Sequence, residues 1–416
     1  MKLRVLGFAV GAVVLVGCGG GGDSSNGILP PAPDPVCTTA VPAQKVATPK
    51  YGPNVIVPQS SLPTGSSLIA HTNHLIYRSS GGSRANSPQG LVPSQVLGAY
   101  GIPSNGGSGA IAIIVAYNYV TALNDFNNFS AQFGLPTEPS ADPLSAANQV
   151  FQVIYATGTK PTDDAGWGQE AAIDTQWAHA MAPNAKIYLV EAASPYTKDL
   201  MDAAQVARAL PGVRQVSMSF GAAEDACQFA NYDGDLVKAG VTFFASAGDT
   251  AGEKDFPGLS RNVVCVGGTT LDVTSGGVWI NETAWNGTGG GKSGFEPRPT
   301  FQDGLTDIVG RYRGGPDISA VADPATGVSV YDSTPAQGVS GWIVFGGTSV
   351  STPIIAGIAN VAGGRSSSQA QNAVFYAGIG SGNFNDITTG ASGSLSAGPG
   401  YDLVTGVGTP NGLGGF

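Results

Sequence analysis

The chain reads Gly346-Gly347-Thr348-Ser349-Val350-Ser351-Thr352-Pro353 at its most informative point, and a run of small apolar residues follows over 354–362. This pattern predicts a glycine-rich turn that delivers Ser349 to the start of a helix. Unpaired N–H groups at a helix N-terminus can stabilise an oxyanion, which is what a serine nucleophile needs. The structural alternative is a helix cap, because serine and threonine are common caps.

A serine nucleophile needs a base, and the three histidines of the chain are poor candidates. His71 and His74 lie in a polar N-terminal region that we expect to be irregular. His179 lies near the end of a predicted helix over 169–182, where it can meet the last carbonyls and the helix dipole. We therefore interpret His179 as structural.

Two carboxylates on the same predicted helix are better candidates. Glu170 and Asp174 are spaced i and i+4, so their side chains share one face. In a cleft, such a pair would share a proton and raise one pKa, which makes a glutamate base oriented by an aspartate plausible. The alternative is a solvated helix face, on which the pair has no function.

Several segments, in the same order along the chain, resemble the sedolisin family of serine-carboxyl peptidases. The serine segment resembles the nucleophile segment of subtilisin-like proteases, and Glu170-x-x-x-Asp174 with residues 177–187 resembles the acid-pair helix of sedolisins. Residues 241–250 match the segment that carries the oxyanion aspartate, here Asp249. The ranges 263–270 and 316–324 match as well, and the likeness extends from about residue 92 to the C-terminus.

The resemblance implies an endopeptidase with Ser349 as nucleophile, Glu170 as base, Asp174 as its orienting partner and Asp249 as oxyanion donor. Its substrates would be proteins or peptides. An aspartate donates a hydrogen bond only while protonated, so the activity should be greatest at acid pH.

The chain departs from the family pattern in three places. Val115 stands where many sedolisins have a further acid, and Phe220 stands where some have tryptophan. The stretch before the peptidase-like region is also too short for the usual folded prodomain. The alternative function is therefore a catalytically weak or inactive lipid-tethered binding protein that retains the fold.

The C-terminal region resembles the calcium site of the same family. Asp386 and Asp402 would supply carboxylates, and Ile387, Gly398 and Gly400 would supply backbone carbonyls to one structural Ca²⁺. Calcium prefers six or more oxygen ligands of these kinds. Without the resemblance, the same residues are equally typical of Asx and glycine turns.

Composition and periodicity fit an α/β enzyme. Predicted strands alternate with helical stretches, which indicates a subtilisin-like, mostly parallel central sheet with helices on both faces. The strand candidates are 111–115, 186–190, 213–218 and 241–245. Asp249 then lies at the carboxyl end of a strand, where such sheets bind ligands. The chain has 29 acidic and 19 basic residues, and this excess argues against nucleic acid as a partner. We expect a monomer.

The N-terminal sequence predicts export from the cytoplasm. Residues 1–17 have the basic start and short apolar run of a signal peptide, and Leu15-Val16-Gly17-Cys18 resembles the lipobox of bacterial lipoproteins. A lipid on Cys18 would anchor the protein in the bacterial cell envelope, at the outer membrane facing the periplasm or the exterior. An ordinary signal peptide with a chance cysteine is the alternative.

Four regions follow from this reading. Residues 1–17 are the signal peptide, 18–35 a Gly/Ser/Pro tether, 36–85 an N-terminal extension and 86–416 the peptidase domain. The extension is a strap on the domain or a vestigial propeptide. Cys227 and Cys265 flank the Asp249 strand, which makes a bridge between them conceivable, whereas Cys37 has no assigned partner.

Overall fold

The computed structural model describes residues 51–78 and 86–416, all within one compact unit, Val36–Phe416. The predicted signal peptide, Cys18, the tether and Cys37 lie outside the described residues. Within the described part, no helix has both the length and the apolar character needed to cross a membrane.

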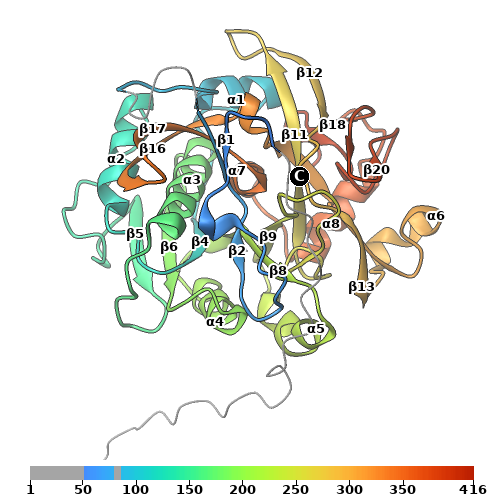
Figure 1. Cartoon of the computed structure of the whole chain (residues 1–416), viewed down its shortest axis with the longest axis horizontal. Coiled ribbons are helices and arrows are strands. Elements are labelled where there is room, and N and C mark those ends of the chain that lie inside the picture. Colours follow the sequence, from blue (N-terminus) through green and yellow to red (C-terminus); the bar gives the residue numbers. More distant parts are fainter. Residues whose placement is uncertain (1–50, 79–85) are drawn as a thin grey trace, which may run out of the picture. The chain divides into compact units, whose positions relative to one another are not determined.

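An eight-stranded sheet forms the centre of this unit (Figure 1). Its strands follow the order β12-β11-β9-β7-β4-β6-β5, and β15 also pairs with β11. All pairs in it are parallel except β11 with β12. The strands are β4 Ala110–Ala116, β5 Phe151–Tyr155, β6 Lys186–Ala192, β7 Val213–Met218, β9 Thr242–Ser246, β11 Val264–Val273, β12 Trp279–Ala284 and β15 Ile318–Val321.

Helices cover this sheet, and a central strand such as β4 is therefore buried along its whole length, whereas the edge strand β12 is largely exposed. α3 contacts β4 and β6, while α7 contacts β7, β9, β11 and β15, and the two helices pack against each other. The helices are α1 Pro93–Tyr100, α2 Ala122–Phe133, α3 Ala165–Met181, α4 Thr197–Ala207, α5 Ala226–Tyr232, α6 Thr306–Val309, α7 Thr348–Val361 and α8 Ser368–Ala377. The predicted subtilisin-like, mostly parallel α/β fold is confirmed.

Smaller sheets surround the central one. One has the order β1-β3-β17-β16 and another the order β10-β8-β2, so strands from the N-terminal segment pair with two different parts of the domain. The remaining strands are β1 Val55–Ile56, β2 His71–Thr72, β3 Leu75–Tyr77, β8 Phe220–Ala223, β10 Asp255–Phe256, β13 Gly291–Pro297, β14 Tyr312–Gly315, β16 Val328–Ala336, β17 Val339–Gly346, β18 Phe384–Asn385, β19 Ala391–Ser392, β20 Leu395–Ser396 and β21 Thr409–Pro410.

One feature agrees with an expectation drawn from the sequence, and one differs. Helix α7 begins at Thr348, so Ser349 lies in its first turn, as the glycine-rich turn predicts. The N–H groups of a first turn need no intrahelical partner, and that of Ser349 remains available to an external acceptor. The bridge considered between Cys227 and Cys265 does not form, because Cys265 is a free buried thiol and Cys227 is disulfide-bonded to another residue.

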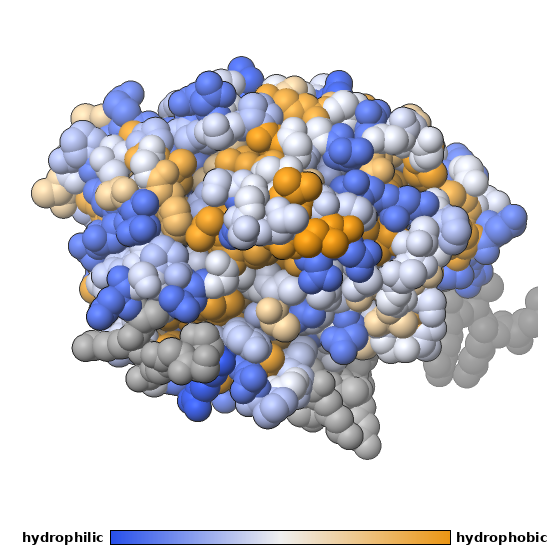
Figure 2. All heavy atoms as spheres, turned by 90° about the horizontal axis from the view of Figure 1, so that it is seen from above, coloured by the Kyte–Doolittle hydropathy of each residue, from blue (hydrophilic) through white to orange (hydrophobic). Residues whose placement is uncertain are grey.

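The surface is mixed in character. The face in Figure 2 carries hydrophobic patches among hydrophilic residues. Exposed apolar side chains include Val278, Trp279 and Ile280, at and beside the start of β12.

Candidate active site

The site is built around Ser349 in the first turn of α7. Gly347 precedes this helix with a φ of 102°, a left-handed conformation that favours glycine and lets β17 turn sharply into α7. The Ser349 hydroxyl is buried and donates to the backbone oxygen of Ser219 at 3.2 Å. Its backbone N–H donates to the carbonyl oxygen of Asn73 at 2.9 Å.

Glu170 faces Ser349 from helix α3. Asp164 begins this helix by accepting a hydrogen bond from the Trp167 N–H, and the packing of α3 on α7 carries Glu170 to the serine. Burial raises the pKa of Glu170 to about 8, although the nearby Ser349 hydroxyl and Asn73 N–H oppose the shift. The carboxyl group is therefore next to the hydroxyl whose proton a base would accept.

Asp174 lies one helical turn beyond Glu170 on the same helix. Its Oδ1 accepts a hydrogen bond from the Ser219 hydroxyl at 2.7 Å. Burial and the neighbouring Glu170 charge raise the pKa of Asp174 well above its usual value. The solvated-face alternative is wrong, because both carboxyl groups are fully buried.

Asp249 approaches the same point from the loop after β9. Its Oδ1 accepts hydrogen bonds from the N–H and the hydroxyl of Thr348, at 2.7 and 2.9 Å. Its Oδ2 has no hydrogen-bond partner among the described residues and lies against Gly347, where a methyl group would overlap with it. Burial, with smaller contributions from Glu253 and Glu170, raises the pKa of Asp249 well above its usual value. A protonated Asp249 would therefore have a donor free at the helix start.

The structure thus brings Ser349, Glu170, Asp174 and Asp249 together from α7, α3 and the loop after β9. Sequence reasoning missed Ser219, which contacts both the serine and the aspartate of the helix. Only its place after a buried strand, β7, pointed to it.

The surroundings of the three histidines agree only in part with those expected from the sequence. His179 is buried and bonds through Nε2 to the carbonyl oxygen of Pro136 at 2.9 Å, so its partner lies outside its own helix. His71 and His74 were expected in irregular structure but are buried, and His71 belongs to β2. The Nδ1 of His74 lies 2.8 Å from Oε2 of Glu170. Burial lowers the pKa of His74 to about 3.

His71 lies in a second cluster beside the site. Its Nε2 is 3.3 Å from a carboxylate oxygen of Glu253 and 3.3 Å from one of Asp255. One potential ligand atom from each of the three residues lies within 4.8 Å of the others, which is compatible with a metal ion. The same geometry is satisfied by an ion pair, because the two carboxylates raise the pKa of His71 well above its usual value although burial lowers it.

The predicted calcium ligands lie together near the C-terminus. Gly400 N–H donates to both carboxylate oxygens of Asp386, at 3.1 and 3.0 Å, and Gly398 N–H donates to Asp402 at 3.0 Å. Ile387 is buried beside Asp386. The donor set consists of carboxylate and carbonyl oxygens, so these residues fit the oxygen preference of calcium.

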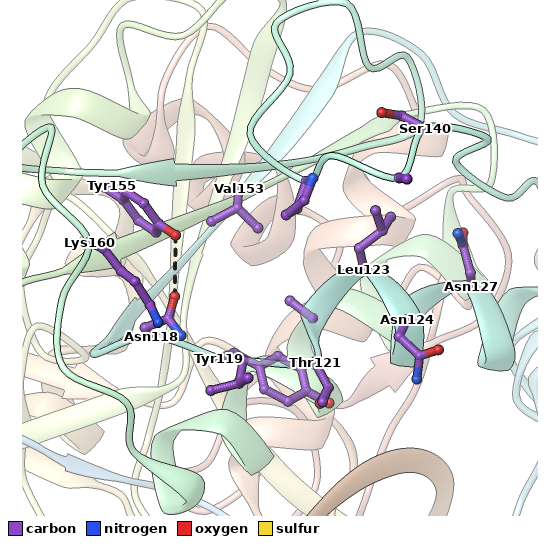
Figure 3. A pocket seen from close by; sticks show the side chains of 14 residues that line it. Asn118, Tyr119, Thr121, Leu123, Asn124, Asn127, Ser140, Val153, Tyr155 and Lys160 are labelled. Atoms are coloured by element: carbon purple, nitrogen blue, oxygen red, sulfur yellow. Dashed lines mark hydrogen bonds between the residues drawn. The ribbon is translucent and has the colours of Figure 1, made fainter.

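A pocket of about 540 Å³ lies elsewhere, near the carboxyl end of β4 (Figure 3). It is lined by residues 118–121, the start of α2, residues 140, 141 and 143, two residues of β5 and Lys160, and none of the four candidate catalytic residues lines it. The Tyr155 hydroxyl, which bonds to Asn118 at 3.4 Å, points across it.

Comparison with known proteins agrees with this geometry. The fold is subtilisin-like, and the model of the subtilase family matches residues 165–368. Kumamolisin of Bacillus sp. (strain MN-32) is 29% identical over 80% of this chain and 64% of its own length. Sedolisin of Pseudomonas sp. (strain 101) is 30% identical over 72% of this chain and 56% of its own length.

The chain therefore spans somewhat more than half the length of these two relatives. Among solved structures, Pseudomonas sedolisin, a serine-carboxyl proteinase complexed with pseudo-iodotyrostatin, matches with a TM-score of 0.64 and 24% identity. The match covers 78% of this chain and 96% of that one. The chain thus contains a subtilase-type region with sedolisin and kumamolisin among its homologues.

Proposed function

We propose that the protein is a serine-carboxyl endopeptidase that hydrolyses peptide bonds in proteins or peptides. The observation that carries the proposal is the meeting of Ser349 and Glu170 across the α3–α7 contact, with Asp174 behind and Asp249 at the helix start. The homology with kumamolisin and sedolisin supports the same activity.

Each residue then has a defined part in the reaction. Ser349 Oγ attacks the substrate carbonyl, and Glu170 accepts its proton and later gives it to the leaving amine. Asp174 orients Glu170. The Ser349 N–H and a protonated Asp249 stabilise the oxyanion, and such donors are worth about 10²–10³ in kcat each.

The pH dependence follows from the same groups. Glu170 must be ionised to accept the serine proton, while Asp249 must be protonated to donate. In the structure His74 lies against Glu170, and burial raises the pKa of Glu170 to about 8. The proposal requires that water reaches Glu170 in the working enzyme and lowers this pKa, so that the rising limb lies at acid pH. We expect a bell-shaped profile of kcat/KM with its maximum below neutrality. A maximum at neutral or alkaline pH would contradict the part given to Asp249.

Mutation tests the assignment of the base. Ser349→Ala and Glu170→Gln should each remove most hydrolysis of a denatured protein substrate. His179→Ala is the matched control, because His179 is equally buried but bonds only to a backbone carbonyl. Thermal melts verify folding. Loss of activity in the histidine variant, with activity retained in Glu170→Gln, would contradict the serine-carboxyl mechanism.

One calcium ion at Asp386 and Asp402 belongs to the proposal, with Ile387, Gly398 and Gly400 as carbonyl ligands. The hydrogen bonds that gather the two carboxylates round residues 398–402 support it. When bound, the ion would neutralise the two carboxylates and stabilise the folded loop. We further propose attachment to the bacterial envelope through a lipid on Cys18, which lies outside the described residues.

A further inference from the structure

A histidine and two carboxylates meet on the small sheet that β2, β8 and β10 form, in which β8 is the middle strand. His71 on β2 lies opposite Gly221 of β8, and Asp255 on β10 lies opposite Ala223, two residues further along β8. Positions two residues apart on a strand share one face, so the side chains of His71 and Asp255 lie on the same face of this sheet. Gly221 leaves room between them, because a methyl group there would overlap with Oδ2 of Asp255.

Glu253 reaches the same point from the loop that leads from β9 to β10. Its Oε2 accepts hydrogen bonds from the N–H groups of Asp249 and Thr250, at 2.9 and 3.0 Å. Its Oε1 lies 3.3 Å from Nε2 of His71, and the same nitrogen lies 3.3 Å from Oδ2 of Asp255. The three side chains are at most 5% exposed, so these groups form a buried cluster.

The other ring nitrogen of His71 has a partner of its own. Nδ1 lies 3.2 Å from the carbonyl oxygen of Thr72, an atom that can only accept, so this hydrogen bond requires a proton on Nδ1. The neutral imidazole with its proton there presents the lone pair of Nε2 to the two carboxylates. Histidines that bind metal are held in this way, with the other ring nitrogen donating to a backbone carbonyl.

An ion pair accounts for this geometry less well than a metal ion does. One Nε2–H of a protonated His71 cannot point straight at both carboxylates, and charge-assisted N–H···O bonds have lengths of about 2.7–2.9 Å. Oδ2 of Asp255 accordingly has no hydrogen-bond partner among the described residues. An imidazolium also offers one positive charge to two carboxylates, and the neighbouring Lys254 pairs with Glu224 instead, at 3.3 Å. A divalent cation would neutralise both carboxylates.

The distances match those between the ligands of one tetrahedral metal ion. Zn²⁺ bonds of about 2.0–2.2 Å to nitrogen and oxygen place neighbouring ligand atoms about 3.3–3.6 Å apart. We propose that His71, Glu253 and Asp255 bind a Zn²⁺ ion, with water as the fourth ligand. The imidazole ligand favours zinc or another first-row transition metal over calcium and magnesium, which prefer oxygen ligands alone.

The ion would join two segments that are far apart in the chain. His71 belongs to the N-terminal segment, whereas Glu253 belongs to the loop that also carries Asp249. Because the site exists only in the folded protein, bound Zn²⁺ should raise the melting temperature. The inference uses residues other than the predicted calcium ligands, and it does not rest on the proposed hydrolysis.

Metal binding is measured on full-length Ser349→Ala protein without a histidine tag, so that proteolysis cannot complicate the result. The protein is freed of metal with a chelator, and Ca²⁺ is then supplied in excess to occupy the predicted calcium ligands. Titration with Co²⁺ at about pH 7 should give one equivalent of the strong visible absorption that four-coordinate cobalt shows, and Zn²⁺ should abolish this absorption.

Variants in the same background locate the ion. His71→Ala should weaken Zn²⁺ binding by about a hundredfold or more, because changes outside the ligands alone cost about 10–100-fold. Asp255→Asn keeps the shape of the side chain and should also weaken binding; thermal melts verify folding. His179→Ala is the matched control, since His179 is equally buried but bonds to the carbonyl oxygen of Pro136. Cys265→Ser, which removes the free buried thiol, should likewise bind as the parent does.

X-ray absorption of the Zn²⁺-loaded Ser349→Ala protein needs no further variant. It should show one imidazole nitrogen among oxygen ligands at about 2.0–2.2 Å. A shell of oxygen alone, or one that contains sulfur, overturns the assignment.

Equal Zn²⁺ affinity in His71→Ala and its parent places the ion elsewhere and overturns the assignment as well. A folded parent that binds neither Co²⁺ nor Zn²⁺ leaves an ion pair at the cluster and overturns the proposal. None of these outcomes bears on the proposed hydrolysis, which is measured with wild type.

Discussion

The buried carboxyl group of Glu191 should make the free energy of unfolding of this domain depend on pH. It lies within β6, fully buried, and its Oε1 accepts a hydrogen bond from the Tyr119 N–H at 2.9 Å. Its Oε2 has no hydrogen-bond partner among the described residues. Burial raises the pKa of Glu191 from 4.5 to about 8, although the Tyr119 N–H and the charge of Lys160 lower it.

This shift destabilises the protein as the pH rises. The unfolded chain ionises Glu191 near its ordinary pKa, while the folded protein holds the proton up to about pH 8. The stability is therefore fully present in acid and is lost as the pH rises through the folded pKa. At about 1.4 kcal/mol per pKa unit, the loss between about pH 4 and 9 amounts to roughly 5 kcal/mol.

Glu191→Gln should remove most of this dependence. The exchange is made in the full-length Ser349→Ala protein, so that proteolysis cannot complicate unfolding. The new amide group lacks a partner and costs about 1–3 kcal/mol at every pH, so the slope rather than the absolute stability carries the prediction. Urea unfolding between about pH 5 and 9 should give a flatter profile for Glu191→Gln than for its parent.

Glu138 is the matched control with the opposite sign. Burial would raise its pKa, but backbone N–H donors outweigh that effect and lower it; they belong to Val150, Phe151, Ser140 and Gln149. Its contribution is therefore present at neutral pH and lost on acidification. Glu138→Gln should reduce stability at neutral pH and approach the parent in acid. Parallel profiles for Glu191→Gln and its parent would refute the reasoning.

Three further predictions concern the calcium site, the anchor and the oxyanion donor. Chelation of Ca²⁺ should lower the melting temperature, because an ion at a hundredfold its Kd contributes about 2.7 kcal/mol to the free energy of unfolding. Asp402→Asn should have the same effect as chelation. An unchanged melting temperature would count against the site. Ser349→Ala protein from membranes should carry an acyl chain on Cys18 by mass spectrometry and lose it in Cys18→Ser; an unmodified Cys18 would contradict the anchor. Asp249→Asn donates at every pH, so the alkaline limb of kcat/KM should move upward, and an unmoved limb would assign it to another group.

Much of the fold could be predicted from the sequence because its signals are local, whereas the four site residues were assigned together only through the resemblance to sedolisins. Buried strands such as β4 and β6 are continuous apolar runs, and covered parallel strands require them. The i, i+4 spacing places Glu170 and Asp174 on one helix face whatever surrounds the helix. A glycine turn before a helix likewise predicts that the Ser349 N–H has no partner within the helix.

Only the tertiary structure decided what surrounds these residues. The sequence by itself left the acid pair open between a cleft and a solvated face, and the packing of α3 on α7 buries it. The position of His74 beside Glu170 depends on strand pairing between residues far apart in the chain, β2 with β8 and β3 with β17. Strands of two or three residues, such as β2 and β3, are too short to show a hydrophobic periodicity in the sequence. Local sequence therefore determines the chemical groups of the site, whereas long-range strand pairing determines which residues lie against them.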